Sequence, residues 1–460
     1  MRANGKEPGT DIGDRLIVDG GNSLSGNVDV GGFKHSLVTV IAAAAVAQAP
    51  LLIRNVPDIA ETRCLGEFLT ACGASVEQRP AGLYVDAAAL GLDADAGALL
   101  ETIHGGVYLL PGLLAKTGRA SLPVGGGCQI GDGATQARPV QQYIDVLKRF
   151  GAEEGTVVDG RLQVTAPRLR GCDIDLRDYC ADRVLRTGPL YSGATKIALL
   201  AAAVAEGVTR LAHPYPKPDV LDLIEVLRRF GADIAVSRDG TVTVVGNGGR
   251  DLTRTADFTL PADLIEVVTW ICAGALAAET SITVQGTELE RALKGLTPEL
   301  RLLAEMGVEL DLAPGRLTVH RAPLLKPFHL TVSSHGVYSD SQPFLALLAG
   351  RADGRSVLVE TVWKQRFQYA EELWRLGMHT TVSQGELAVS GGCMPFRAGR
   401  TVRGGDLRAA AVLALAALCV EGRTTVLGAA HLRRGYADFA GSLRGLGARV
   451  TEQVTEGVRR

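Results

Sequence analysis

One sequence phrase recurs six times along the chain and constrains the fold more than any other feature. Each copy is a run of apolar and charged residues that stops at a glycine and continues as an alternating strand; the copies read EFLTACGASVE, DVLKRFGAEEG, EVLRRFGADIAV, RLLAEMGVELDL, ELWRLGMHTTV and SLRGLGARVTE. The stop glycines are Gly73, Gly151, Gly231, Gly307, Gly377 and Gly447, which by subtraction lie 70 to 80 residues apart. Because glycine adopts the left-handed conformation at a helix end without strain, each copy predicts an amphipathic helix, its end and the next strand.

Two further patterns complete the repeating unit. AVSRDGTVTVV and LDLAPGRLTVH place Asp-Gly or Pro-Gly between alternating segments, which predicts β-hairpins. HSLVTVIAAAAVAQA, GATKIALLAAAVAEG, DLIEVVTWICAGALAAE and DLRAAAVLALAALCVEG are apolar nearly all round, which predicts helices buried on most faces. Six such units favour two α/β domains of three units each, with the buried helices inside. A tandem solenoid is the weaker alternative, because units of about 75 residues are long for that architecture.

Composition bounds the class of protein. A chain of 460 residues with 46% hydrophobic content supports about two domains. The 48 Lys and Arg nearly balance the 50 Asp and Glu, so we expect neither nucleic acid nor an anionic membrane as a partner. No apolar run reaches the roughly 20 residues of a spanning helix, and the first fourteen residues lack the apolar centre of a signal peptide. We therefore expect a cytoplasmic protein, with its eight scattered cysteines reduced.

The segment SLPVGGGCQIGDGATQARPVQQYIDVL, residues 121–147, has the composition of a functional loop. Three glycines precede Cys128, and Arg138 follows across a polar stretch. Glycine runs suit a backbone that moves or that approaches a ligand closely. A cysteine beside an arginine on such a loop can act as a nucleophile or general acid, although an ordinary loop cysteine is the alternative.

Isolated basic residues in different repeats suggest an anion site. Besides Arg138, they are Lys34, Arg366, Arg408 and Arg434. Lys34 and Arg408 stand at the starts of predicted buried helices, where free N–H groups already favour anions. A single surface arginine is usually a solvated charge, but several that converge would bind a small polyanion through bidentate contacts.

Acidic residues at helix starts have two interpretations. Asp340, in SSHGVYSDSQPF, precedes a further apolar run, and Asp263 and Glu266 lie together in LPADLIEVV. Each carboxylate could cap a helix, which is the more common role, or act as a general base beside an acceptor hydroxyl. The residues alone leave both alternatives open.

The repeat, the GGGC loop, the DLR segment and the RGY segment together resemble the enolpyruvyl transferases, and most closely the branch that acts on UDP-N-acetylglucosamine in peptidoglycan synthesis. The similarity runs from about Asp14 to Val450. It implies the two-domain inside-out α/β barrel built from six repeats, with three repeats per domain. The implied domains are residues 34–260, and residues 14–33 with 261–454. It also implies that no metal or organic cofactor is needed and that the domains close on substrate.

The resemblance assigns roles to residues that match the family pattern. Cys128 would deliver a proton to the methylene carbon of phosphoenolpyruvate, and Asp340 would take the proton of the acceptor hydroxyl. Lys34, counted with these two as catalytic, would bind phosphoenolpyruvate together with Arg138, Arg408 and Arg434, while Arg366 would lie in the same cleft. The remaining residues expected to contact substrate are His35, Pro139, Val140, Ser192, Gly193 and Asp263.

The chain departs from the peptidoglycan branch at positions expected to hold the acceptor. His35 replaces an asparagine, His104 and Leu264 replace arginines, and five extra residues separate Cys128 from Arg138-Pro139. Pro189-Leu190-Tyr191-Ser192-Gly193-Ala194-Thr195 replaces Lys-Val-Ser-Val-Gly-Ala-Thr, which removes a lysine that helps to hold a diphosphate and adds a tyrosine where a sugar could lie.

This pattern resembles the enolpyruvyl transferases of nikkomycin and polyoxin pathways, which act on the 3′-hydroxyl of UMP. The expected partners are therefore phosphoenolpyruvate and a uridine nucleotide, and the retained Arg138-Pro139-Val140 agrees with uridine. The alternatives are a divergent UDP-N-acetylglucosamine enzyme and a catalytically silent nucleotide-binding paralogue. A shikimate-3-phosphate transferase is disfavoured, because that branch lacks the loop cysteine.

Overall fold

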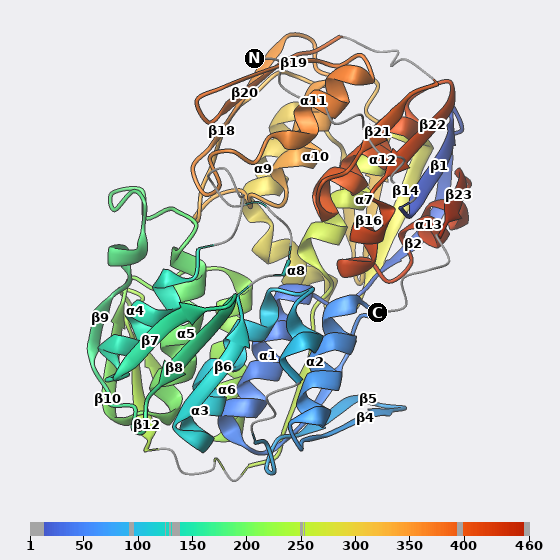
Figure 1. Cartoon of the computed structure of the whole chain (residues 1–460). Coiled ribbons are helices and arrows are strands. Elements are labelled where there is room, and N and C mark those ends of the chain that lie inside the picture. The colour runs from blue at the N-terminus through green and yellow to red at the C-terminus, as the bar shows by residue number, and fades with distance from the viewer. Residues whose placement is uncertain are drawn as a thin grey trace, which may run out of the picture.

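The computed structural model describes residues 13–91, 96–124, 126–127, 130, 139–248, 252, 254–392 and 399–454. Within these ranges the chain forms two α/β halves, seen one below the other in Figure 1. One hydrophobic core runs from Leu37 to Leu260, and the other joins Leu16–Phe33 to Ala262–Val450. The two-domain α/β fold predicted from the repeat is confirmed, and we propose the domain boundaries stated above on the basis of these cores.

The lower half contains three repeats. The first comprises α1 (Lys34–Ala47), β3 (Pro50–Arg54), α2 (Ala60–Ala71), β4 (Ser75–Arg79) and β5 (Gly82–Asp86). The second comprises η1 (Ala96–Leu100), η2 (Gly105–Leu109), α3 (Leu110–Thr117), β6 (Arg119–Pro123), α4 (Gln141–Arg149), β7 (Glu154–Val158) and β8 (Arg161–Thr165). The third comprises β9 (Asp173–Asp175), η3 (Leu176–Tyr179), α5 (Tyr191–Val204), β10 (Glu206–Ala212), α6 (Pro218–Phe230), β11 (Asp233–Val236) and β12 (Val242–Asn247).

The upper half repeats the pattern. Its first repeat comprises β2 (Leu24–Val30), α7 (Leu264–Ala277), β14 (Ala278–Gly286), α8 (Leu289–Gly295), α9 (Thr297–Met306), β15 (Leu310–Ala313) and β16 (Arg316–His320). The next comprises β17 (His329–Val332), α10 (Gln342–Ala349), β18 (Arg355–Glu360), α11 (Gln368–Arg375), β19 (His379–Ser383) and β20 (Glu386–Ser390). The last comprises β1 (Arg15–Gly20), β21 (Thr401–Arg403), α12 (Leu407–Leu418), β22 (Gly422–Leu427), η4 (Ala429–Arg434), α13 (Phe439–Gly445) and β23 (Arg449–Gln453).

Local sequence signals account for these elements. All six stop glycines have positive φ, between 92° and 104°, as predicted for helix ends. The predicted hairpins are the antiparallel pairs β11–β12 and β15–β16. The four apolar segments form α1, α5, α7 and α12, which are almost wholly buried. Within the described ranges, five sheets have four strands and one has three. The shorter buried helices α3 and α10 fill the corresponding place in the remaining two repeats.

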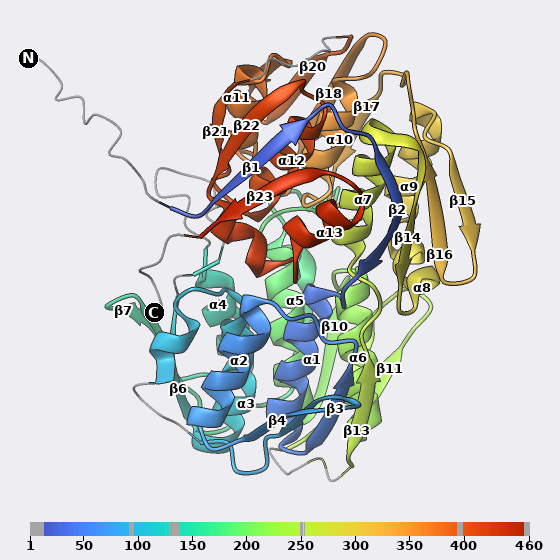
Figure 2. The same cartoon turned by 90° about the vertical axis from the view of Figure 1, so that its right-hand side faces the viewer.

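The chain crosses between the halves twice, and each crossing exchanges a strand. β2 pairs in parallel with β14 of the upper half, yet it leads into α1 of the lower half. A further strand, β13 (Ala256–Thr259), pairs in parallel with β3 of the lower half and leads into α7 of the upper half. Figure 2 shows β2 beside β14 and α1 directly below. The crossings therefore fix the starts of α1 and α7 at the junction of the halves.

Hydrogen bonds between the two crossing segments hold this junction. The Asp263 carboxylate caps α7 by accepting from Ile265 N and Glu266 N, and it accepts from Lys34 N at 3.0 Å. Glu266 accepts from Gly31 N at 3.1 Å and from Trp270 Nε1 at 3.3 Å. Burial, and then the nearby Asp263 carboxylate, raises the pKa of Glu266 to about 8. Asp263 is thus the cap of α7, and Glu266 is a buried carboxyl group that joins α7 to the backbone of Gly31.

The described helices include none that is long and apolar enough to cross a bilayer.

We expect Gly307→Ala to lower the free energy of unfolding by about 1 to 2 kcal/mol, because a Cβ at φ 95° is strained even where space is open. Gly445→Ala is the matched control: Gly445 is also exposed with open space around its Cα, but it lies at the end of α13 without positive φ. The control should leave stability equal or higher. Equal melting temperatures for the two variants in calorimetry would contradict the helix-end role of Gly307.

The raised pKa of Glu266 predicts a pH-dependent stability. The folded state retains the proton up to about pH 8, whereas the unfolded state loses it near 4.5, so this contribution is complete below pH 4.5 and is lost as pH rises through about 8. Glu266→Gln should reduce the fall in melting temperature between pH 5 and pH 9, by the equivalent of roughly 3 to 5 kcal/mol at most. Glu279→Gln, an exposed change on β14, is the control. An unchanged pH profile in Glu266→Gln would contradict the assignment.

Candidate active site

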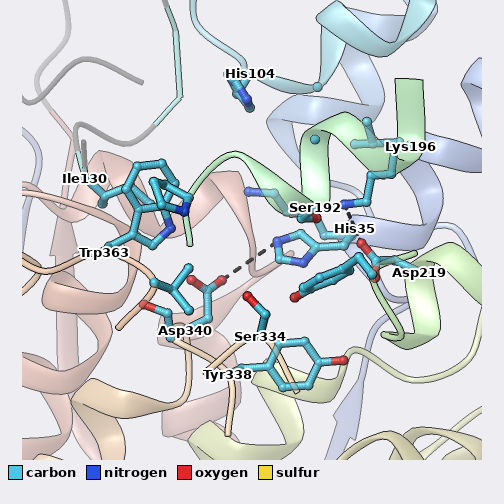
Figure 3. Close-up of a pocket in the computed structure, with 18 of the residues that line it drawn as sticks. His35, His104, Ile130, Ser192, Lys196, Asp219, Ser334, Tyr338, Asp340 and Trp363 are labelled. Carbon is cyan, nitrogen blue, oxygen red and sulfur yellow. Dashed lines mark ion pairs between the residues drawn. The ribbon is translucent and has the colours of Figure 1, made fainter. Parts of the chain in front are cut away.

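A cavity lies where the two halves face each other. The empty space in and over the cavity, with the open solvent at its mouth included, is about 1350 Å³. The lower half contributes the first turns of α1 and α5 to its wall, and the upper half contributes the loop before α10, the start of α12 and the end of η4. Figure 3 shows side chains from both halves pointing into this space.

Asp340 is held at the cavity wall by two guanidinium groups. Its Oδ1 lies 2.5 Å from Arg366 Nη1, and its Oδ2 lies 3.2 Å from Arg408 Nη2. Burial alone would raise the pKa of Asp340, but the charges of Arg366 and Arg408 outweigh burial and hold this pKa well below its ordinary value. The N-cap of α10 is Ser341, without a side-chain capping bond. The helix-cap interpretation of Asp340 is therefore wrong, because its carboxylate faces the arginines.

A second carboxylate, Glu61, organises the other basic side chains. Lys34 Nζ lies 2.9 Å from Glu61 Oε1, and Arg434 Nη2 lies 3.3 Å from the same oxygen. Burial works to raise the pKa of Glu61, but the two cations overcome it and lower this pKa. Glu61 stands in the first turn of α2. Sequence reasoning missed it, because a charge in an amphipathic helix usually faces solvent.

The described cavity lining has an excess of positive charge. It contains five cationic side chains, those of Lys34, Lys196, Arg366, Arg408 and Arg434, against three carboxylates, those of Glu61, Asp219 and Asp340, which leaves a net charge of +2 by subtraction. Four of the cations converge on Asp340 and Glu61, and the guanidinium groups of Arg366 and Arg408 are almost fully buried. Such an arrangement favours a small polyanion, since partly desolvated cations gain most from an anionic ligand.

His35 lies between the Asp340 carboxylate and a second ion pair, formed by Lys196 and Asp219 (Figure 3). Its Nε2 is 3.8 Å from Asp340 Oδ2. Burial lowers the pKa of His35 to about 4, although the Asp340 carboxylate opposes that shift. The imidazole is therefore neutral at physiological pH and can donate or accept a hydrogen bond from either nitrogen.

Lys196 and Asp219 form an ion pair beside His35. Lys196 Nζ lies 2.5 Å from Asp219 Oδ2, and both side chains are largely buried while lining the cavity. Lys196 projects from α5, and Asp219 stands in the first turn of α6. Sequence reasoning missed this pair. The available signal was a lysine inside the otherwise apolar segment GATKIALLAAAVAEG.

The start of α5 lines the cavity through Ser192 and Gly193, whose binding of substrate stays a prediction. A Cβ on Gly193 would lie 2.7 Å from Tyr143 Cε1, so only glycine lets the tyrosine ring approach so closely. Tyr143 Oη in turn lies 3.0 Å from His104 Nε2, which also lines the cavity.

Three residues that the sequence placed at the substrate site, Tyr191, Asp263 and Val140, do not line the cavity. Tyr191 does not fill sugar space: it is fully buried, and its hydroxyl donates to the His213 carbonyl at 2.7 Å. Asp263 lies behind the cavity wall and positions Lys34 through its backbone. Pro139 lines the cavity, whereas Val140 is the N-cap residue of α4 and packs on the core.

Two predicted residues, Cys128 and Arg138, lie outside the described residues. Within the described ranges, no group of three or more His, Cys, Asp or Glu side chains could hold a metal ion.

The chain is similar to curated proteins over nearly its whole length. The UDP-N-acetylglucosamine 1-carboxyvinyltransferase of Anaeromyxobacter sp. is 35% identical over 447 residues, which are 96% of this chain and 99% of that protein. The enzyme of the same name from Synechocystis sp. is 32% identical over 446 residues, 95% of this chain and 94% of that protein.

Solved structures extend the comparison. The enolpyruvyl transferase NikO from Streptomyces tendae has a TM-score of 0.90 and 46% identity, covering 96% of this chain and 99% of that one. EPSP synthase from Acinetobacter baumannii shares the fold, with a TM-score of 0.69 at 19% identity, covering 96% of this chain and 100% of that one. The profile of EPSP synthase (3-phosphoshikimate 1-carboxyvinyltransferase) matches residues 18–443. The chain therefore belongs to the EPSP synthase family and is an enolpyruvyl transferase.

Proposed function

We propose that the protein transfers the enolpyruvyl group of phosphoenolpyruvate to the 3′-hydroxyl of UMP, with release of phosphate. Its two partners are then small cytoplasmic metabolites. The observation that carries the proposal is the convergence of Lys34, Arg366, Arg408 and Arg434 around two carboxylates that line the same cavity, Glu61 and Asp340.

The basic cluster suits phosphoenolpyruvate. A phosphate and a carboxylate on neighbouring atoms require cations on two sides, and Lys34 with Arg434 lies on one side while Arg366 with Arg408 lies on the other. The same cations stabilise the charge that develops as phosphate departs, because they are already in position before reaction. By the resemblance to the family, Arg138 joins this cluster.

The proton transfers are assigned to two residues. Asp340 takes the proton of the acceptor hydroxyl as its oxygen bonds to C2 of phosphoenolpyruvate, while Cys128 gives a proton to C3. The product is a tetrahedral ketal. Loss of phosphate from C2 and of a proton from C3 then restores the double bond as an enol ether. Binding of phosphoenolpyruvate draws Arg366 and Arg408 toward its own anionic groups, which raises the pKa of Asp340 when a base is needed.

The charges at the acceptor end favour a nucleoside monophosphate over a sugar diphosphate. Pro189 lines the cavity where the peptidoglycan branch has a lysine. The remaining cation on this side, Lys196, is neutralised by Asp219 at 2.5 Å. The 46% identity to the enolpyruvyl transferase NikO, against 35% to the Anaeromyxobacter enzyme, agrees with the resemblance to the nikkomycin-type transferases on which the choice of UMP rests. Pro139 at the cavity wall is consistent with a uracil base held there.

UDP-N-acetylglucosamine is the alternative acceptor. It is favoured by relatives that carry this activity in their names and match nearly the whole chain. The two acceptors differ in charge and size, so one assay separates them.

Phosphate release from phosphoenolpyruvate should occur with UMP and be at least about 100-fold slower with UDP-N-acetylglucosamine. The reason is that Pro189 stands where the peptidoglycan branch has the lysine that helps to hold the diphosphate. Coupled phosphate detection with each acceptor, and without any acceptor, measures this directly. Release with the sugar nucleotide alone would contradict the proposal and assign the UDP-N-acetylglucosamine activity to the protein. Release with neither acceptor would favour a catalytically silent paralogue.

Asp340→Asn should lower kcat by roughly 10² to 10⁴-fold through loss of the proton acceptor. The KM for phosphoenolpyruvate should not rise, because two arginines lose a competing carboxylate. Asp438→Asn is the isosteric control: Asp438 caps α13 through Gly441 N and does not line the cavity, so kcat should be unchanged. Retention of more than half of kcat in Asp340→Asn would exclude the base role.

A further inference from the structure

The Lys196–Asp219 pair has hydrogen-bonding capacity that the described part of the chain does not use. The ammonium group has three donors, and it contacts Asp219 Oδ2 at 2.5 Å. The other carboxylate oxygen, Asp219 Oδ1, is buried and has no hydrogen-bond partner among the described residues. A buried acceptor without a partner costs about 1 to 3 kcal/mol, so a ligand that supplies a donor would recover that energy.

The pair suits an uncharged hydroxyl better than a phosphate. Burial works to raise the pKa of Asp219, but Lys196 outweighs it and lowers this pKa, so the pair is ionised and its net charge is zero. His35, next to it, is neutral. A phosphate would meet the carboxylate as well as the ammonium group. A hydroxyl can accept from Lys196 and donate to Asp219 at the same time.

The pair also lies next to the site of proton transfer. His35 Nε2 is 3.8 Å from Asp340 Oδ2, and the charges of Asp340, Lys196 and Asp219 all act on the His35 ring. Figure 3 shows His35 between Asp340 on one side and the Lys196–Asp219 pair on the other. Only one side chain therefore separates the pair from the carboxylate that takes the proton of the reacting hydroxyl.

We propose that Lys196 and Asp219 bind the hydroxyl adjacent to the reacting one, which makes them the residues that select a ribonucleotide acceptor through its 2′-hydroxyl. This inference rests on the proposed function, in which the 3′-hydroxyl of UMP reacts. The 2′-hydroxyl and 3′-hydroxyl of ribose are neighbours on one face of the ring. If the 3′-hydroxyl approaches Asp340, the 2′-hydroxyl is directed toward His35 and the pair.

A purely structural role for the pair predicts something different. An ion pair that only joins α5 to α6 would affect every acceptor equally when it is removed. A pair that binds the 2′-hydroxyl affects UMP and leaves 2′-deoxyuridine monophosphate unaffected. The informative quantity is thus the ratio of kcat/KM for the two nucleotides, since a general loss of folded protein cancels in it.

The first arm of the test uses the unmodified enzyme with phosphoenolpyruvate and either nucleotide. We expect kcat/KM for UMP to exceed that for 2′-deoxyuridine monophosphate by about 100-fold or more, because the deoxynucleotide leaves both buried groups without a ligand partner. Equal values would overturn the inference while leaving the proposed function intact. No turnover with UMP, together with turnover of UDP-N-acetylglucosamine, would overturn the proposed function and the ribose assignment with it.

The second arm uses the double variant Lys196→Met with Asp219→Leu. It removes both charges together, so that neither charge stays buried without its partner. We expect kcat/KM for UMP to fall about 100-fold, to the value for the deoxynucleotide, and the deoxynucleotide value to stay within a few-fold. Lys116→Met is the control: Lys116 is an exposed lysine at the end of α3 that bonds Gln48 and the Ala88 carbonyl, and both values should be unchanged. An equal fall for both nucleotides in the double variant would show a structural role only. If the double variant does not fold, Asp219→Asn takes its place and should reduce the ratio of kcat/KM for the two nucleotides about 10-fold. The first arm needs no variant and decides the question together with it.

Discussion

Two carboxylates, the buried Glu61 and the partly buried Asp340, make the cavity possible. Lys34, Arg366, Arg408 and Arg434 could not share one partly desolvated space without them, because like charges at close range in a low dielectric repel strongly. Glu61 takes Lys34 and Arg434, while Asp340 takes Arg366 and Arg408. Each carboxylate thereby holds its cations ready for an anionic ligand. The contacts with Arg366 and Arg408 also lower the pKa of Asp340 and so keep it ionised.

The crossing segments determine that these charges meet at all. Lys34 opens α1 in the lower half, but its backbone N–H is bonded to Asp263, the cap of α7 in the upper half. Asp340 comes from the upper half and reaches His35 of the lower half. The hydroxyl of Thr187 also contacts those of Ser334 and Thr361 across the junction. Charged groups that line the cavity from both halves are thus anchored to the same junction, so the geometry of the cavity depends on how the halves meet.

The repeat predicted the architecture well for a physical reason. Glycine ends a helix through its own backbone freedom, and the six stop glycines all have the positive φ that this requires. The buried helices are recognisable in the sequence because they are apolar on nearly every face. In α12 the one charged residue, Arg408, stands at the start of the helix. The site was harder to predict. Asp340 and Asp263 carry the same local pattern, a carboxylate before a helix, yet Asp263 caps its helix and Asp340 binds two arginines.

By itself the sequence determined the repeating units, their helix ends and hairpins, the two-domain α/β class and the set of basic residues expected to bind an anion. These features depend on backbone conformation and on hydrophobic periodicity, which act over a few residues. Only the tertiary structure decided which charges are partners. Glu61 and Arg434 are 373 residues apart in the chain, and no local pattern joins them. The pairing of Lys196 with Asp219 and the place of Tyr191 in the core were likewise decided by the tertiary structure, because both depend on how α5 packs against the elements around it.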